Sequence, residues 1–113
     1  MSRAERERLL DIVAACSAIS SHVVRGDADA DLVFDAIRIR LVEIGEAVKG
    51  LPPSLRDREP SVPWEEIARM RDVLTHRYFD TTHAIVLSTA RNDIPQLAAA
   101  VGRLLAVLES DGR

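Results

Sequence analysis

Residues 32–49 read LVFDAIRIRLVEIGEAVK, and this stretch decides the fold class. Its apolar residues recur three or four positions apart, which is the spacing of one face of an α-helix. They are Val33, Ile37, Leu41, Ile44 and Val48, widened by Leu32, Phe34 and Val42. An apolar face of this width predicts a helix that is buried against more than one neighbour.

Gly45 lies inside this predicted helix, where a glycine costs about 1 kcal/mol relative to alanine. Such a glycine often permits a close crossing, because no Cβ stands between the two helix backbones. Gly50 follows the last periodic residue as a C-cap, and Pro52-Pro53 prevents the helix from continuing. We therefore expect a second helix to pass close to Gly45.

The residues before this stretch predict another helix. Ser2 and Glu5 form a capping box, and apolar residues at helical spacing follow over residues 3–24. Gly26 is expected to end this helix, and the acidic turn at residues 27–31 to cap the next one.

The residues after it predict a connector and a third main helix. Residues 54–59 fit one short helical turn, and Pro63 suits the first position of the helix that follows. Trp64 is the only tryptophan of the chain, and we expect it to anchor the connector to the core. The core face of the third helix consists of Ile67, Met70 and Leu74.

A fourth helix is predicted to begin at a cap within residues 80–82 and to end near Gly112. Residues 92–95 interrupt its pattern, because Pro95 lacks the backbone N–H that a helix interior needs. Strand-like alternation is absent from the sequence. We therefore predict an all-α up-and-down bundle of four main helices, the last kinked or split near Pro95, in a single domain over residues 1–113.

Composition limits the possible functions. The chain has 113 residues, of which 47% are hydrophobic, so one folded core is expected. Cys16 is the only cysteine, which excludes an internal disulfide and a cysteine-based zinc site. A net charge of −3 argues against nucleic-acid binding through bulk charge. With no signal peptide and no apolar run long enough to span a bilayer, a cytoplasmic protein without membrane contact is expected.

Residues 71–78, RDVLTHRY, contain several groups that could take part in binding or catalysis. Arg71 supplies a fixed cation, His76 a group that titrates near neutral pH, Thr75 a hydroxyl and Tyr78 a phenol. These are the groups that hold a phosphate and move a proton beside it. Each also has a structural interpretation: a solvated or capping histidine, an arginine that covers the edge of the core, and an ordinary core-edge tyrosine.

On a regular helix the two main candidate residues, Arg71 and His76, point in different directions. Five residues at 100° each place Arg71 and His76 about 140° apart around a regular helix, so they would not easily share one phosphate. Either the helix ends before His76, or His76 faces a second chain across a two-fold interface. Asp72 lies four residues before His76, where its carboxylate would favour the charged imidazolium.

The pattern R-x4-H-x-Y of Arg71, His76 and Tyr78 resembles the signature of HEPN-domain proteins, and specifically of the HepT-like family. Three further segments resemble this family in the same order along the chain. They are Ile44-Gly45-Glu46-Ala47, Pro63-Trp64 and Asn92-Asp93-Ile94-Pro95.

The resemblance implies a homodimer whose paired motifs line a cleft, and a metal-independent endoribonuclease that acts as a toxin without a cofactor. Its partners would be the RNA substrate and an antitoxin, a nucleotidyltransferase of the MntA type. Arg71 would stabilise charge on the phosphate, and His76 would act as general acid or base. Tyr78 matches the tyrosine that the antitoxin modifies with AMP, and Asp72 and Thr75 would support the site.

One alternative of another class stays open. In it the same cleft binds a nucleotide or a partner segment without catalysis, and the chain is a binding subunit of a minimal nucleotidyltransferase complex. Growth arrest caused by expression of the chain alone, and abolished by loss of His76, would fit only the enzyme.

Overall fold

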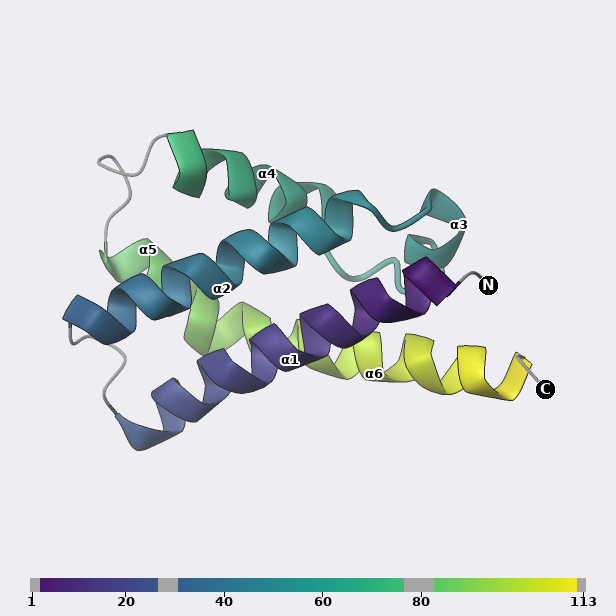
Figure 1. Ribbon diagram of the computed structural model, residues 1–113, viewed down its shortest axis with the longest axis horizontal. Helices are drawn as coiled ribbons and strands as arrows, with labels where there is room; N and C mark the ends of the chain where they lie inside the picture. The colour runs from purple at the N-terminus through teal and green to yellow at the C-terminus, as the bar shows by residue number, and fades with distance from the viewer. Residues whose placement is uncertain (1–2, 27–30, 77–82, 112–113) are drawn as a thin grey trace.

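The computed structural model describes residues 3–26, 31–76 and 83–111, and these ranges are helical apart from short connections. The long helices are α1 (Arg3–Arg25), α2 (Asp31–Lys49), α4 (Trp64–His76) and α6 (Ile94–Asp111) (Figure 1). The shorter elements are α3 (Pro53–Arg56), α5 (His83–Ser88) and the π-helical turn η2 (Thr89–Asp93). The helix spans therefore agree closely with the predicted ones.

Successive long helices run in alternating directions, so that the bundle is up-and-down (Figure 1). In space α2 packs against both α4 and α1, and α1 packs against α6, whereas α4 and α6 scarcely touch. This arrangement confirms the predicted all-α bundle of four main helices. It also explains the width of the apolar face on α2, which has a neighbour on each side.

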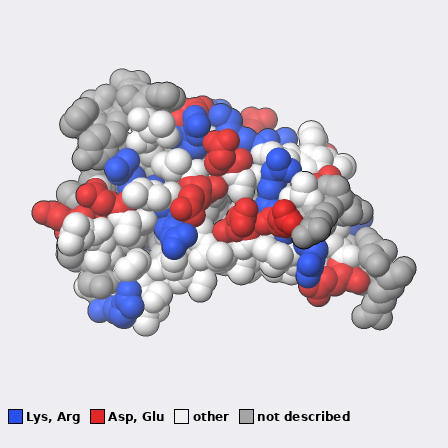
Figure 2. Space-filling model, in the orientation of Figure 1, with Lys and Arg blue, Asp and Glu red and all other residues white. Residues whose placement is uncertain are grey.

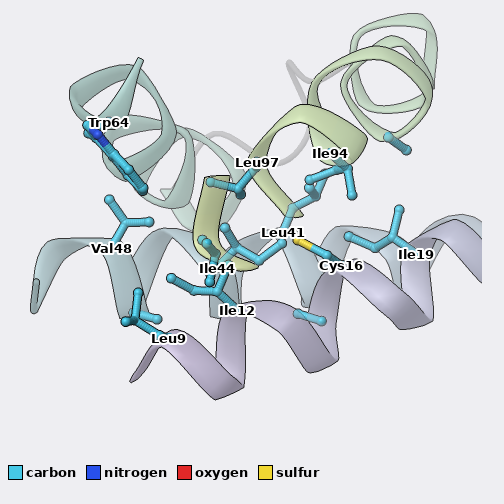
Figure 3. Packing of buried hydrophobic residues seen from close by; sticks show 14 of the residues in the cluster. Leu9, Ile12, Cys16, Ile19, Leu41, Ile44, Val48, Trp64, Ile94 and Leu97 are labelled. Atoms are coloured by element: carbon cyan, nitrogen blue, oxygen red, sulfur yellow. The ribbon is translucent and has the colours of Figure 1, made fainter. Parts of the chain in front are cut away.

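The core is mainly aliphatic and lies where α1, α2 and α6 meet, with Leu41 and Ile44 of α2 close to Ile12 of α1 and Leu97 of α6 (Figure 3). Four predicted core residues of α2 are fully buried: Ile37, Leu41, Ile44 and Val48. Leu32 differs from the prediction, since it is 86% exposed. It stands in the first turn of α2.

Trp64 anchors the connector before α4, as predicted. Its ring is buried, and its indole N–H donates to the carbonyl oxygens of Arg56 and Glu59, each at 3.0 Å. Pro63 lies one residue before α4, and its carbonyl accepts the N–H of Ile67 at 3.1 Å. The proline therefore caps the helix, one position earlier than expected, and the connector fixes the start of α4.

The predicted interruption near Pro95 takes the form of a wider helical turn. The N–H of Ile94 bonds to the carbonyl of Thr89, five residues back, and α6 continues from there. A proline ring collides with the carbonyl four residues before it in a regular α-helix. A π-helical turn directly before Pro95 relieves this collision, so that α5, η2 and α6 follow one another without a loop.

Candidate active site

The position of Arg71 is determined by a close crossing of α2 and α4 at Gly45. A Cβ on Gly45 would lie 2.5 Å from the Cβ of Arg71 and 3.1 Å from the carbonyl oxygen of Ile67. Real Cβ atoms essentially never come within 3.0 Å of another atom, so the contact with the Cβ of Arg71 means that only glycine permits the observed distance between these backbones. The predicted close crossing at Gly45 is therefore confirmed, and the residue opposite it is the arginine of the motif.

Two carboxylates hold the guanidinium of Arg71. Its Nε lies 2.8 Å from Oε2 of Glu46, the residue next to Gly45 on α2, and NH1 donates to Oδ1 of Asp72 at 3.0 Å. The hydrogen bond to Asp72, and then the charge of Glu46, raise the pKa of Arg71 above its ordinary value. The side chain is 29% exposed, so part of this fixed cation remains accessible.

Asp72 has a second cationic partner, Lys49. The ammonium of Lys49, the last residue of α2, lies 3.3 Å from Oδ1 of Asp72, the same oxygen that NH1 of Arg71 contacts. Hydrogen bonds from Arg71 and then from Lys49 lower the pKa of the Asp72 carboxyl, which is therefore charged at neutral pH. These four residues, Glu46, Lys49, Arg71 and Asp72, are called the charge network below.

The end of α4 receives a further contact from α2. NH1 of Arg38 donates to the carbonyl oxygen of Leu74 at 3.4 Å, in the last turn of α4. A cation suits this position because the carbonyls at the C-terminal end of a helix carry partial negative charge. Arg38 thus stabilises the turn that leads to His76.

The backbone places His76 as the last residue of α4. The helix therefore does not end before His76. An early end of the helix, which would have turned His76 toward Arg71, is not observed. On this helix the two residues stand about 140° apart. The side chain of His76 and all of Tyr78 lie outside the described residues, so the expected contact between Asp72 and His76 is untested there. Thr75 is exposed on α4.

One face of the molecule carries mixed charge. In Figure 2 acidic and basic side chains are interspersed over the helices on the face that is drawn. Within the described ranges no helix has the length and apolar character needed to cross a membrane. The same ranges contain no group of three or more histidine, cysteine, aspartate or glutamate side chains arranged to hold a metal ion.

A groove of about 720 Å³ opens elsewhere on the molecule, between α4 and the segment formed by η2 and α6. Ile67 and Met70 of α4 line one side, and Ile94 and Leu97 of α6 line the other. It exists because α4 and α6 scarcely touch. Arg71 does not line this groove, which is therefore separate from the charge network.

A comparison with family models matches residues 12–104 to the HepT-like family, described as "Ribonuclease HepT-like". The chain belongs to the HepT-like ribonuclease family. The match runs from α1 to α6 and includes both Gly45 and the motif on α4. Membership therefore concerns the whole bundle, and not the short motif alone.

Relatives agree with this assignment. A protein from Thermococcus cleftensis named "Probable ribonuclease HepT" is 34% identical over 92% of this chain and 98% of its own length. "Putative RNase TTE0752" from Caldanaerobacter subterraneus subsp. tengcongensis is 41% identical over 73% of this chain and 78% of its own length. "Putative RNase MJ0125" from Methanocaldococcus jannaschii is 40% identical, and the match covers 62% of its length. The comparison with solved structures gives no significant match.

Three residues around this candidate site were not assigned a role from the sequence: Arg38, Glu46 and Lys49. All three come from α2, and their contacts depend on how α2 crosses α4. The available signal was Gly45, because residues next to a crossing glycine lie close to the neighbouring helix. Glu46 adjoins Gly45, and Lys49 follows one turn later on the same side.

Proposed function

We propose that this HepT-like chain is a metal-independent endoribonuclease and that it acts as the toxin of a toxin–antitoxin pair. The observation that carries the proposal is the fixed, partly exposed guanidinium of Arg71 on the helix that ends with His76. A cation held by other residues needs little reorganisation when charge develops on a phosphate, which is the condition for electrostatic catalysis.

In this mechanism Arg71 stabilises the negative charge that develops on the phosphate during cleavage. His76 takes the proton of the attacking 2′-hydroxyl or gives a proton to the leaving oxygen, as general base or general acid. Histidine suits either role near neutral pH, because its ordinary pKa of about 6.5 leaves both protonation states populated.

The active form is proposed to be a homodimer. Arg71 and His76 stand about 140° apart on one helix, so a single chain does not easily present both to one phosphate. A two-fold axis brings two copies of α4 together and pairs the Arg71 of one protomer with the His76 of its partner. The cleft between the protomers then holds the RNA.

The proposed antitoxin is a nucleotidyltransferase of the MntA type that adds AMP to Tyr78. The modification would bring a phosphodiester of about one negative charge next to the cleft, where Arg71 could bind it in place of RNA. Tyr78→Phe is expected to keep cleavage activity and to escape the antitoxin. Mass spectrometry of the co-expressed proteins tests this, and an unmodified Tyr78 in an inhibited complex would mean that the antitoxin acts by binding alone.

Expression of the chain alone separates the toxin from the alternative, a non-catalytic binding subunit. We expect wild-type expression to arrest growth and His76→Ala to abolish the arrest at equal protein level. His22→Ala is a suitable control, since it removes another histidine, on α1. Normal growth with folded wild-type protein would favour the binding subunit.

A further inference from the structure

Lys49 and Arg71 converge on a single oxygen atom. Oδ1 of Asp72 lies 3.3 Å from the ammonium of Lys49 and 3.0 Å from NH1 of Arg71. The two cations come from different helices, α2 and α4, so this point is defined by the close crossing at Gly45. An oxygen anion held between an ammonium and a guanidinium has the surroundings in which proteins bind a phosphate oxygen.

The point of convergence is accessible to a ligand. The side chains of Lys49 and Asp72 are 45% and 47% exposed. Within the described ranges no helix covers the pair completely, so an anion from solution can approach both cations.

Stability alone does not explain the contact between Lys49 and Asp72. An exposed ion pair contributes about 0–1 kcal/mol to folding, because water screens the charges and two long side chains lose freedom. Arg71 also has its own partner in Glu46, at 2.8 Å, and does not need Lys49 to keep its position. The contact of Lys49 with Asp72 therefore adds little to the stability of the fold, and a functional role is the better explanation for it.

We propose that Lys49 is a second phosphate-binding residue of the RNA site, and that Asp72 occupies the position of a phosphate oxygen in the free protein. This rests on the proposed function of Arg71 as a phosphate ligand. When RNA binds, its phosphate oxygen takes both cations and the Asp72 carboxylate turns to solvent. Lys49 binds as a point charge and therefore contributes affinity without selecting a base.

The charge network explains how a protein with a net charge of −3 can attract an RNA phosphate at one point of its surface. Its two cations and two carboxylates balance in the free protein. Displacement of Asp72 exposes both positive charges only at the point where a phosphate replaces it. Bulk charge is then unnecessary, because the attraction acts over the few ångströms between the phosphate and the two side chains.

Binding of a 2′-O-methyl RNA oligonucleotide tests the proposal without cleavage, since the attacking hydroxyl is blocked. Fluorescence anisotropy at several salt concentrations gives the affinity and its salt dependence. We expect Lys49→Gln to weaken binding roughly tenfold for oligonucleotides of any sequence. The slope of log K against log salt should fall by about 0.7, the value for one phosphate contact with a single strand.

Two variants act as controls for Lys49→Gln. Lys49→Arg keeps the cation and should bind like the wild type. Arg6→Gln removes the same charge from an exposed site on α1 that pairs with Glu109 at 3.5 Å, and it should leave the salt slope unchanged. Asp72→Asn should tighten binding, because it removes the carboxylate that competes with the phosphate. Weaker binding by Asp72→Asn would overturn the placeholder role of this residue.

The outcomes separate this proposal from the ribonuclease function. Wild-type binding with an unchanged affinity and slope in Lys49→Gln overturns the role of Lys49 alone. Absence of oligonucleotide binding by the wild type overturns both proposals. Binding that depends on Lys49, in a protein that does not cleave unmodified RNA, supports the phosphate site and contradicts the ribonuclease.

Discussion

Arg71 depends on neighbours from two helices, and each fixes a different part of its guanidinium. Glu46 of α2 lies beside Nε, and Asp72 of α4 accepts from NH1. The ammonium of a lysine at this position would keep the charge but lack the planar set of donors that serves both carboxylates at once. The contacts at position 71 therefore require the geometry of an arginine as well as its charge.

Arg71→Lys should consequently lose most activity while the protein stays folded. We expect the rate of RNA cleavage to fall by about 10²–10³, the usual effect of removing one group that stabilises transition-state charge. Arg69→Lys provides the matched control, as Arg69 is exposed on the same helix. Equal rates for Arg71→Lys and the wild type, measured with intact helicity, would exclude this role.

Glu59 predicts a pH dependence of stability that is separate from the active site. Arg103 of α6 contacts its carboxylate through Nε at 3.2 Å and NH2 at 2.7 Å, and this hydrogen bonding lowers the pKa of Glu59. A lowered pKa in the folded state stabilises the protein above the unfolded pKa of about 4.3, and this stability is lost as the pH falls.

Glu59→Gln should therefore be less stable than the wild type at pH 7, and the difference should disappear below the folded pKa of Glu59. Thermal unfolding of both proteins across this acid range measures it. Glu65→Gln, an exposed change in the first turn of α4, controls for the loss of one carboxylate. A difference that grows as the pH falls would have the wrong sign.

At the scale of elements, the crossing of α2 and α4 depends on Gly45. Gly45→Ala gains about 1 kcal/mol in helix propensity, but its Cβ meets backbone and Cβ atoms that do not move easily. Overpacking of this kind costs about 1–3 kcal/mol, so we expect a lower Tm and, because Arg71 shifts, weaker cleavage.

Gly102→Ala is the matched control for Gly45→Ala. Gly102 also lies inside a helix, α6, but a Cβ there would meet nothing within 4 Å. We expect this variant to gain about 0.5–1 kcal/mol, because alanine loses less backbone entropy on folding. A stabilised Gly45→Ala protein with full activity would show that the close crossing does not position Arg71.

The helices themselves were predictable from the sequence, because their signals are local. Gly26 has a φ of +76° and ends α1, as its position after the periodic residues predicted. Trp64, the only tryptophan of the chain, was also expected to anchor the connector to the core, and it is buried. The form of the break near Pro95 could not be predicted from the sequence. The missing N–H of a proline predicts an irregular turn, but it does not specify a π-helical one.

The charge network was less predictable, because it joins residues far apart in the sequence. Arg71 and Asp72 were recognised as candidates, but Glu46 and Lys49 reach them only through the packing of α2 on α4. Helical periodicity identifies the buried face of each helix and not the rotation of one helix against another. The roles proposed for His76 and Tyr78 stay predictions, since these side chains lie outside the described residues.

At the scale of the whole molecule, the proposed site requires two chains. Sedimentation should show a homodimer at micromolar concentration, because His76 follows Arg71 by about 140° on α4 and a second protomer is needed to complete the site. A monomer that cleaves RNA at this concentration would remove the need for a shared cleft.

Mixed dimers test the shared site more closely. If Arg71 and His76 of one site come from different protomers, a dimer of one Arg71→Ala chain and one His76→Ala chain contains one intact site. Random exchange of subunits makes half of all dimers mixed, so about a quarter of the wild-type rate should return. Mixtures that form mixed dimers, yet stay inactive, would indicate that each site belongs to one chain.

Cleavage of RNA by the purified protein in EDTA tests most directly whether this HepT-like chain is a metal-independent ribonuclease. We expect the wild type to cleave under these conditions, and His76→Ala to be slower by about 10²–10⁴ with an unchanged circular dichroism spectrum. An intact RNA substrate after incubation with the folded wild-type dimer, or equal cleavage by wild type and His76→Ala, would contradict the proposed function.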